Sequence, residues 1–376
     1  MSALDEARKR LPTIASLDAG RFAGAAGAVG AALAVGTALG VVAERVVVRR
    51  SLKSDPDRDE PYGGLRGRVV PVTASDGVSL HVEVEDPPIG SLADKRGDGL
   101  TIVFSHGYAL EEDCWHYQRR DLRALGRLVF WDQRSHGRSG RSDPAAATID
   151  QLGRDLAAVV DATCPAAGPV ILVGHSMGGM TVMAYADLRP EEFGSRVRGV
   201  AMLSTSAGGL TSVDFGLPAP LARTVRRVTP GVMTSMVRQK DLVERTRKLG
   251  SDLGLVLTRR LSFASDVSPT MAAFVHRMLW NTPIDVVADF LPTLDQHDRL
   301  RAIQLFTEVE TLVLVGDKDL MTPPSHSEEI IARLPGVELV RVPDSGHMVM
   351  LERYPEVNQQ LRDLTSRVRA RLATAR

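Results

Sequence analysis

The sequence lacks the features that mark several large classes of protein. Only two cysteines occur, Cys114 and Cys164, and two cysteines so far apart form neither a disulfide framework nor the close spacing of a metal site. The 46 basic and 46 acidic residues cancel, so no excess charge favours nucleic acid as a partner. We therefore expect a globular protein that binds no nucleic acid, in a chain long enough to bury a large core.

One long apolar run stands out near the N-terminus. Residues 22–43 contain no charged side chain and one polar side chain, Thr37, and 22 residues suffice for a helix that spans a bilayer. We expect a transmembrane helix at 22–43 after a short N-terminal segment, 1–21, and hence a single-pass membrane protein. Alanine, glycine and valine supply the hydrophobicity, so a cleaved signal peptide and a buried helix of a soluble protein remain alternatives. Basic residues flank both ends of the run, which leaves the orientation in the membrane open.

The rest of the chain divides into a linker and one folded region. Residues 44–68 are charged and rich in turn formers, which is typical of a linker. From 69 to 376, short β-rich runs alternate with helical patterns, except at about 209–306, where helical segments follow one another without a strong strand. This alternation predicts an α/β fold with a mostly parallel sheet and helices on both faces. The interruption predicts a helical cap inserted late in the sheet.

A serine in a strand-turn-helix setting is the first chemical signal. The apolar run at 170–173 leads into Gly174-His175-Ser176-Met177-Gly178, and a helical pattern follows. In the Gly-x-Ser-x-Gly motif, a sharp turn lifts the serine hydroxyl clear of the sheet, and glycines two before and two after it prevent a clash. Ser176 is therefore the predicted nucleophile.

A serine hydroxyl needs a base and a group that orients the base. Of the nine histidines, only His347 follows the serine in a loop directly after a predicted strand, the one at 337–342. It is the predicted base. The strand predicted at 311–315 leads into Asp317 and Asp319, and either carboxylate can orient the histidine.

Two backbone N–H groups must stabilise the negative charge that develops on a substrate carbonyl. One donor is Met177, the residue after the nucleophile. The other is expected in the loop after the strand at 100–104, where Gly107 permits close approach of the backbone and Tyr108 is the candidate. His106, just before this glycine, is interpreted as a brace of the loop rather than as a second base.

These motifs resemble those of the α/β-hydrolase superfamily, in its capped serine esterase and lipase branch. The resemblance runs from about residue 69 to the C-terminus. In that family the acid is the fourth residue of Gly-x-x-Asp and a proline follows, which selects Asp319, with Pro323 downstream. The family's Gly-His pair is matched by Gly346-His347. Its Asp-x-Arg-Gly-x-Gly-x-Ser is matched by 132–139, with Ser135 in place of the first glycine.

The resemblance implies hydrolysis of a carboxylic ester through an acyl-enzyme, with neither cofactor nor metal. Apolar side chains in the expected cap and the membrane helix favour a small-molecule ester of apolar or lipid-like character. The same triad serves cofactor-free haloperoxidases, perhydrolases and hydrolases of carbon–carbon bonds. A non-catalytic membrane-bound scaffold or receptor is the alternative from another class. The natural substrate, its acyl-chain length and the oligomeric state stay open.

Overall fold

The computed structural model describes residues 55–239 and 251–374. The N-terminal segment expected at 1–21 and the transmembrane helix expected at 22–43 lie outside these residues. Among the helices that the structure does describe, none combines the length and the apolar character needed to cross a bilayer.

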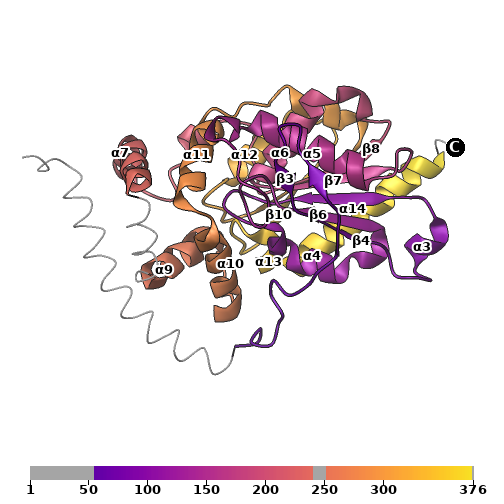
Figure 1. Cartoon of the computed structure of the whole chain (residues 1–376), viewed down its shortest axis with the longest axis horizontal. Coiled ribbons are helices and arrows are strands. Elements are labelled where there is room, and N and C mark those ends of the chain that lie inside the picture. The colour runs from indigo at the N-terminus through magenta and orange to yellow at the C-terminus, as the bar shows by residue number, and fades with distance from the viewer. Residues whose placement is uncertain (1–54, 240–250, 375–376) are drawn as a thin grey trace, which may run out of the picture. The chain divides into compact units, whose positions relative to one another are not determined.

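An eight-stranded sheet lies at the centre of the described residues, in the order β1-β4-β6-β5-β7-β8-β9-β10 (Figure 1). Neighbouring strands from β6 to β10 are parallel, whereas β4 pairs in antiparallel fashion with both β1 and β6. A separate ribbon joins β2 to β3. The strands are β1 (Arg68–Val69), β2 (Val72–Thr73), β3 (Ser79–Leu80), β4 (Val82–Glu85), β5 (Thr101–Ser105), β6 (Arg127–Trp131), β7 (Val170–His175), β8 (Val197–Leu203), β9 (Glu310–Gly316) and β10 (Leu339–Val342).

Both faces of the sheet are buried because side chains alternate along each strand. In β5, Ile102 and Phe104 belong to one hydrophobic cluster, whereas Val103 belongs to the cluster on the opposite face. Continuous apolar runs are what a sheet covered on two sides requires. The strand pattern of the sequence is thus a direct consequence of burial on both faces.

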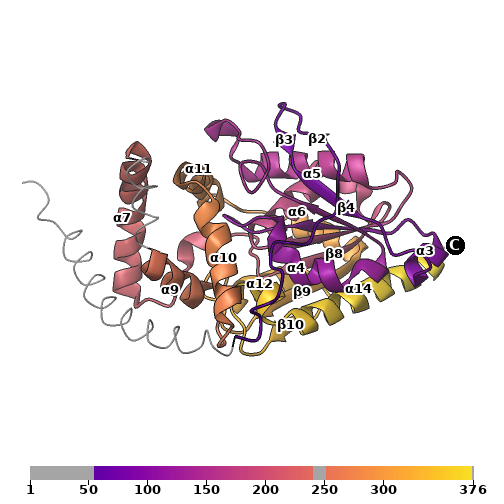
Figure 2. The ribbon, with the colours of Figure 1, turned by 60° about the horizontal axis from the view of Figure 1, so that its bottom comes forward.

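Helices cover the two faces, as Figures 1 and 2 show. Helices α5, α6 and α12 pack on one face, and α4, α13 and α14 pack on the other. The helices outside the cap are α3 (Leu92–Arg96), α4 (His116–Asp121), α5 (Ile149–Thr163), α6 (Met177–Leu188), α12 (Pro324–Ile331), α13 (Val349–Glu352) and α14 (Tyr354–Thr374).

Four further helices lie between β8 and β9 in the described chain and form the cap: α7 (Ala219–Arg238), α9 (Ser251–Ser262), α10 (Pro269–Asn281) and α11 (Ile284–Asp295). Helix α10 joins the hydrophobic cluster of α4 and α14, and α11 packs against α6. Short 3₁₀ turns, η5 (Leu210–Ser212) and η6 (Ala302–Glu308), flank the four helices. The predicted fold class, a mostly parallel sheet with helices on both faces and an inserted helical cap, is confirmed.

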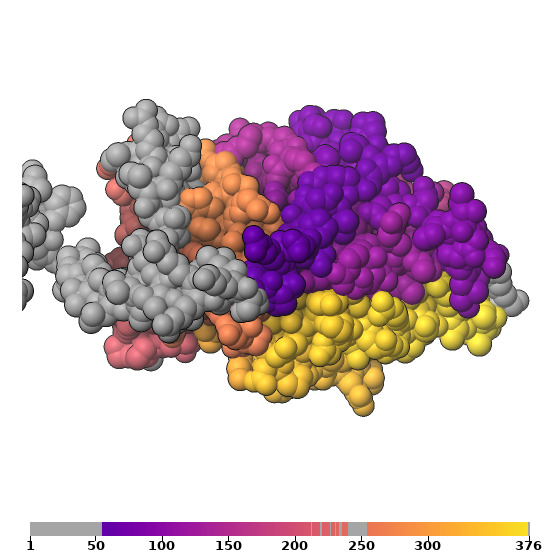
Figure 3. All heavy atoms as spheres, turned by 90° about the horizontal axis from the view of Figure 1, so that it is seen from below, coloured from indigo at the N-terminus to yellow at the C-terminus, as the bar shows by residue number. Residues whose placement is uncertain are grey.

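The described part of the predicted linker is a packed part of the structure. Tyr62 stacks on Phe274 of α10 at 4.8 Å between ring centroids, and its hydroxyl lies 2.6 Å from that of Tyr117 in α4. Further contacts join this segment to the cap and the core: Asp55 to Thr270, Asp57 to Ser268, Glu60 to His116 and Arg66 to Asp113. Figure 3 shows the start of the described chain, in indigo, against the orange cap. The charges that made this stretch resemble a solvated linker have partners on elements distant in sequence.

Candidate active site

Ser176 lies at the sharp turn between β7 and α6. Its backbone has φ 53° and ψ −121°, a conformation that is unfavourable for a residue with a side chain and persists only when the surroundings hold it. The surroundings do so here. The Ser176 amide donates to the carbonyl of Leu203 at 3.1 Å, and the Thr205 hydroxyl donates to the Ser176 carbonyl at 2.7 Å.

The glycines around Ser176 allow backbones to approach where no side chain fits. A Cβ at Gly178 would lie 2.0 Å from the carbonyl oxygen of Ser105, at the end of β5. A Cβ at Gly174 would lie 2.5 Å from the carbonyl oxygen of Gly178, and one at Gly179 would lie 2.5 Å from Thr205 Oγ1. The motif therefore lets α6 begin directly against the neighbouring strand ends.

His347 and Asp319 form a direct pair across two loops. His347 follows β10, and its Nδ1 lies 2.9 Å from Asp319 Oδ2 and 3.1 Å from Oδ1. Asp317 is exposed and accepts a bond from the Ser345 amide at 3.3 Å. Of the two loop carboxylates, the structure brings to the histidine Asp319, the residue that the family resemblance selected.

The Asp319 carboxylate is buried but well solvated by the protein. Its Oδ1 accepts from the amides of Met321 and Thr322 at 2.8 and 2.9 Å, and its Oδ2 accepts from the Thr322 hydroxyl at 2.9 Å. Burial acts to raise the pKa of Asp319, but His347 and the donors of Thr322 outweigh it, so the pKa lies below its usual value. An ionised Asp319 fixes the proton of His347 on Nδ1 and leaves Nε2 as the basic nitrogen.

His175 connects the nucleophile turn to the histidine loop. Its Nε2 lies 2.9 Å from the His347 carbonyl, and the two rings are 4.8 Å apart between centroids. Burial lowers the pKa of His175 to about 3, so its imidazole stays neutral. Ser176, which is adjacent in sequence, is thereby held beside the loop that carries His347.

The two candidate oxyanion donors belong to segments adjacent to Ser176, the predicted nucleophile. Met177 is the first residue of α6, and the first amides of a helix have no partner within it. Gly107 brings the other loop close, because a Cβ there would lie 3.1 Å from Ser176 Cβ and 2.9 Å from His175 Nδ1. The Tyr108 hydroxyl donates to the carbonyl of Val287, so the side chain ties this loop to α11 of the cap.

Three residues that support the site were not identified from the sequence: Gln133, Thr181 and Thr322. Thr322 completes the shell of donors around Asp319, whose Oδ1 also accepts from the amide two residues on, as in an Asx-turn. His106 braces its loop, as interpreted from the sequence, because its Nδ1 lies 2.7 Å from the Gly107 carbonyl and its Nε2 accepts from the Gln133 amide at 2.9 Å. Burial lowers the pKa of His106 to about 4, so it stays neutral.

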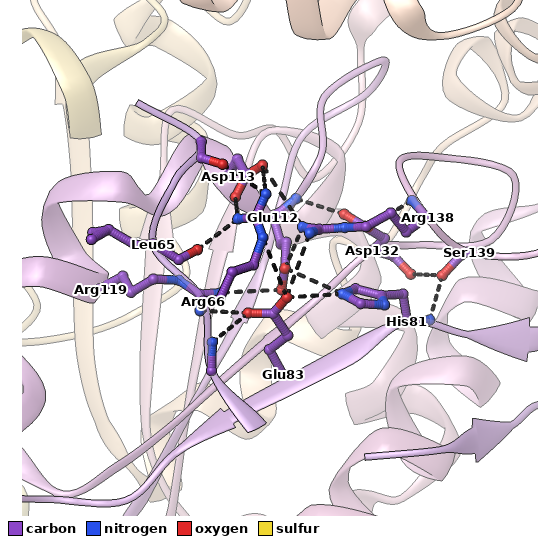
Figure 4. Close-up of polar contacts among 12 residues, drawn as sticks. Leu65, Arg66, His81, Glu83, Glu112, Asp113, Arg119, Asp132, Arg138 and Ser139 are labelled. Atoms are coloured by element: carbon purple, nitrogen blue, oxygen red, sulfur yellow. Dashed lines mark hydrogen bonds and ion pairs between the residues drawn. The ribbon is translucent and has the colours of Figure 1, made fainter. Parts of the chain in front are cut away.

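Figure 4 shows a second cluster, in which acidic, histidine and arginine side chains surround Glu83 and Glu112. Ligand atoms of His81, Glu83 and Glu112 lie within 4.8 Å of one another, a grouping that has the atoms of a metal site. However, Arg119 Nη1 lies 2.7 Å from Glu83 Oε2, and Arg138 Nη2 donates a hydrogen bond to Glu112 Oε1. Because two guanidinium groups already neutralise these carboxylates, the cluster fits a buried ion-pair network better than a cation site.

Ser176, Asp319 and His347 follow β7, β9 and β10, so all three lie beyond the carboxyl ends of parallel strands. Ligands of open α/β sheets bind at these ends. The arrangement has the parts of a nucleophile, a base and an orienting acid.

Comparisons with known proteins agree with this architecture. The model of the alpha/beta hydrolase family matches residues 102–360. The dihydrolipoyllysine-residue acetyltransferase component of the acetoin cleaving system of Pseudomonas putida is 26% identical over 263 residues, which are 70% of this chain and 62% of that protein. The chain thus spans less than two thirds of that relative's length.

Monoacylglycerol lipase of Mycolicibacterium smegmatis is 28% identical over 278 residues, which are 73% of this chain and 88% of that protein. A thermophilic esterase from Thermogutta terrifontis, 22% identical, superposes with a TM-score of 0.60 over 80% of this chain and 99% of its own, which shows a shared fold. Because the family model covers more than half of the sequence, this chain belongs to the alpha/beta hydrolase family.

Proposed function

We propose that this hydrolase cleaves carboxylic esters through an acyl-enzyme intermediate on Ser176. The observation that carries the proposal is the Asp319–His347 pair, with 2.9 Å between Oδ2 and Nδ1. The His347 carbonyl of this pair bonds to His175, the residue before the strained Ser176. A buried carboxylate that accepts four hydrogen bonds fixes one tautomer of its histidine. Such an arrangement activates a serine hydroxyl without cofactor or metal.

In the proposed mechanism, His347 Nε2 accepts the proton of the Ser176 hydroxyl as its oxygen attacks the ester carbonyl. The amides of Met177 and Tyr108 hold the resulting oxyanion. His347 then protonates the departing alcohol. It next takes a proton from the water that attacks the acyl-enzyme, and it returns this proton to Ser176 Oγ as the acid leaves. Asp319 stays ionised throughout and stabilises the imidazolium that forms.

We propose that the substrate is an ester with an apolar or lipid-like acyl group. Met177 and Met180 of α6 share a hydrophobic cluster with Val286 and Phe290 of the cap helix α11, so the surroundings of one oxyanion donor are apolar. Two other apolar side chains of the expected cap, Phe274 and Met278 of α10, pack instead into the hydrophobic cluster of α4 and α14. The lipase among the relatives acts, by its name, on monoacylglycerols, and this agrees with the proposal.

The substrate class is tested with p-nitrophenyl esters from acetate to palmitate. We expect kcat/KM to rise about tenfold for every two methylenes added, until the chain fills its site, because each buried methylene contributes about 0.8 kcal/mol. The Ser176→Ala protein, assayed on the same esters, corrects for spontaneous hydrolysis. A preference for acetate would contradict the lipid-like substrate, and activity only with peroxide and halide or with aryl diketones would replace the ester by one of the alternative reactions.

We also propose that residues 22–43 anchor the enzyme in a membrane as a single helix. Full-length protein is expected to sediment with membranes and to resist extraction by high salt and by carbonate. The double variant Leu33→Arg, Val35→Arg is expected to be released, because each arginine at the centre of a helix costs about 3 kcal/mol on insertion. The matched pair Leu11→Arg, Ile14→Arg lies outside the run and should stay bound. Wild-type protein in the soluble fraction, or a mature N-terminus near Glu44, would contradict the anchor.

A further inference from the structure

Gln133 joins the two sides of the candidate oxyanion hole through one side chain. It lies in the loop after β6 and is fully buried. Its Nε2 donates to the carbonyl of His106 at 2.6 Å, and its Oε1 accepts from the hydroxyl of Thr181 at 2.6 Å. His106 precedes Tyr108 by two residues, and Thr181 lies one turn after Met177 on α6. The amide therefore spans the gap between the elements that carry the two donors.

The contact on the side of the loop orients the Tyr108 amide. Gln133 holds His106 at two points, since its backbone amide also donates to His106 Nε2 at 2.9 Å. With Nε2 accepting, the proton of the neutral ring is on Nδ1, which donates to the Gly107 carbonyl at 2.7 Å. That carbonyl and the Tyr108 N–H belong to one trans peptide, so they point in opposite directions. Fixing the carbonyl fixes the direction of the N–H.

The contact on the side of the helix holds its first turn. Thr181 is fully buried, and its hydroxyl lies 3.0 Å from the carbonyl of Met177 as well as 2.6 Å from Gln133 Oε1. A shift of the loop relative to α6 would break the bond of the Gln133 amide either to His106 or to Thr181 and leave a buried polar group unpaired, at a cost of about 1–3 kcal/mol. The separation of the donors is therefore tied to the two hydrogen bonds of the Gln133 amide.

We propose that Gln133 is a positioning residue that sets the separation and orientation of the Tyr108 and Met177 amides for the oxyanion. The inference rests on the proposed ester hydrolysis, in which both amides act together on one oxygen. Donors that are preorganised at the transition state contribute to kcat, whereas ground-state binding of the ester is little affected. Gln133 touches no reacting atom and acts through His106 and Thr181.

The test compares Gln133→Met with a matched control, Gln118→Met. Gln118 is a fully buried glutamine whose Nε2 also bonds across elements, to the Met350 carbonyl at 3.1 Å and to Asn358 at 2.8 Å, but it contacts neither donor element. On a p-nitrophenyl ester, Gln133→Met is expected to lower kcat by about 10²-fold with KM within about threefold. Gln118→Met is expected to lower Tm by a similar amount and to leave kcat within about threefold.

A second readout separates positioning from a structural role. The affinity for a trifluoromethyl ketone, whose adduct with Ser176 carries an oxyanion, should fall by the same factor as kcat in Gln133→Met. Thr181→Val should lower kcat less, and adding it to Gln133→Met should cause no further loss, because both remove one bridge.

The outcomes that would overturn the inference are distinct from those that concern the reaction. If the wild type is active, two results contradict the positioning role alone. One is an equal kcat for Gln133→Met and Gln118→Met, and the other is that the losses of kcat from Gln133→Met and Thr181→Val add. A wild type that hydrolyses no ester and binds no trifluoromethyl ketone contradicts the proposed function, and the inference falls with it.

Discussion

Ser176→Ala is expected to lower kcat by about 10⁶-fold and to abolish covalent labelling by a fluorophosphonate. The reason is that, in the proposed mechanism, this hydroxyl forms the covalent bond to the acyl group. The fold should persist, because the backbone bonds that hold the turn, to Leu203 and from Thr205, do not involve the Ser176 side chain. Ester hydrolysis and mass-spectrometric mapping of the labelled residue measure both effects.

Ser204 offers a matched control for this experiment. It lies just after β8, is fully buried, and also has a positive φ, 44°. Ser204→Ala removes a hydroxyl from the same edge of the sheet and should leave labelling and turnover within about threefold of the parent. If Ser176→Ala is still labelled at another serine and still turns over ester, the nucleophile has been assigned wrongly.

Asp319→Asn is expected to lower kcat by about 10³- to 10⁴-fold. The asparagine keeps an oxygen for the amides of Met321 and Thr322 and presents its NH₂ group to His347 Nδ1. The ring must then accept at Nδ1 and carry its proton on Nε2, so it can no longer take the proton of Ser176. The imidazolium also loses the charge that stabilises it.

Asp317→Asn is the control, two residues away in the same loop. Because Asp317 is exposed and bonds only weakly to the Ser345 amide, its substitution should stay within about tenfold of the parent. Kinetics of the two variants, each with Tm measured to show a retained fold, decide between the carboxylates. A larger loss in Asp317→Asn would transfer the orienting role to that residue.

The sequence by itself determined the fold class and the setting of the serine. Apolar runs that alternate with helical patterns can be buried only in a sheet covered on both faces, and this depends on local composition. The nucleophile turn is equally local, because strand, glycines, serine and helix are contiguous between 170 and 188. The order of serine, aspartate and histidine followed from which strands their loops follow.

The tertiary structure alone decided contacts between residues distant in sequence. Asp317 and Asp319 are both loop carboxylates, and only the fold of the loops after β9 and β10 brings one of them to within 2.9 Å of His347. Residues 55–67 have the composition of a linker, but hydroxyls of α10 and aromatic rings of α4 and α10 supply partners that local sequence does not reveal. The role of Gln133 could not be predicted for the same reason, because its two hydrogen-bond partners are 27 and 48 residues away in sequence. Its amide joins them only when packing brings both partners within hydrogen-bonding distance.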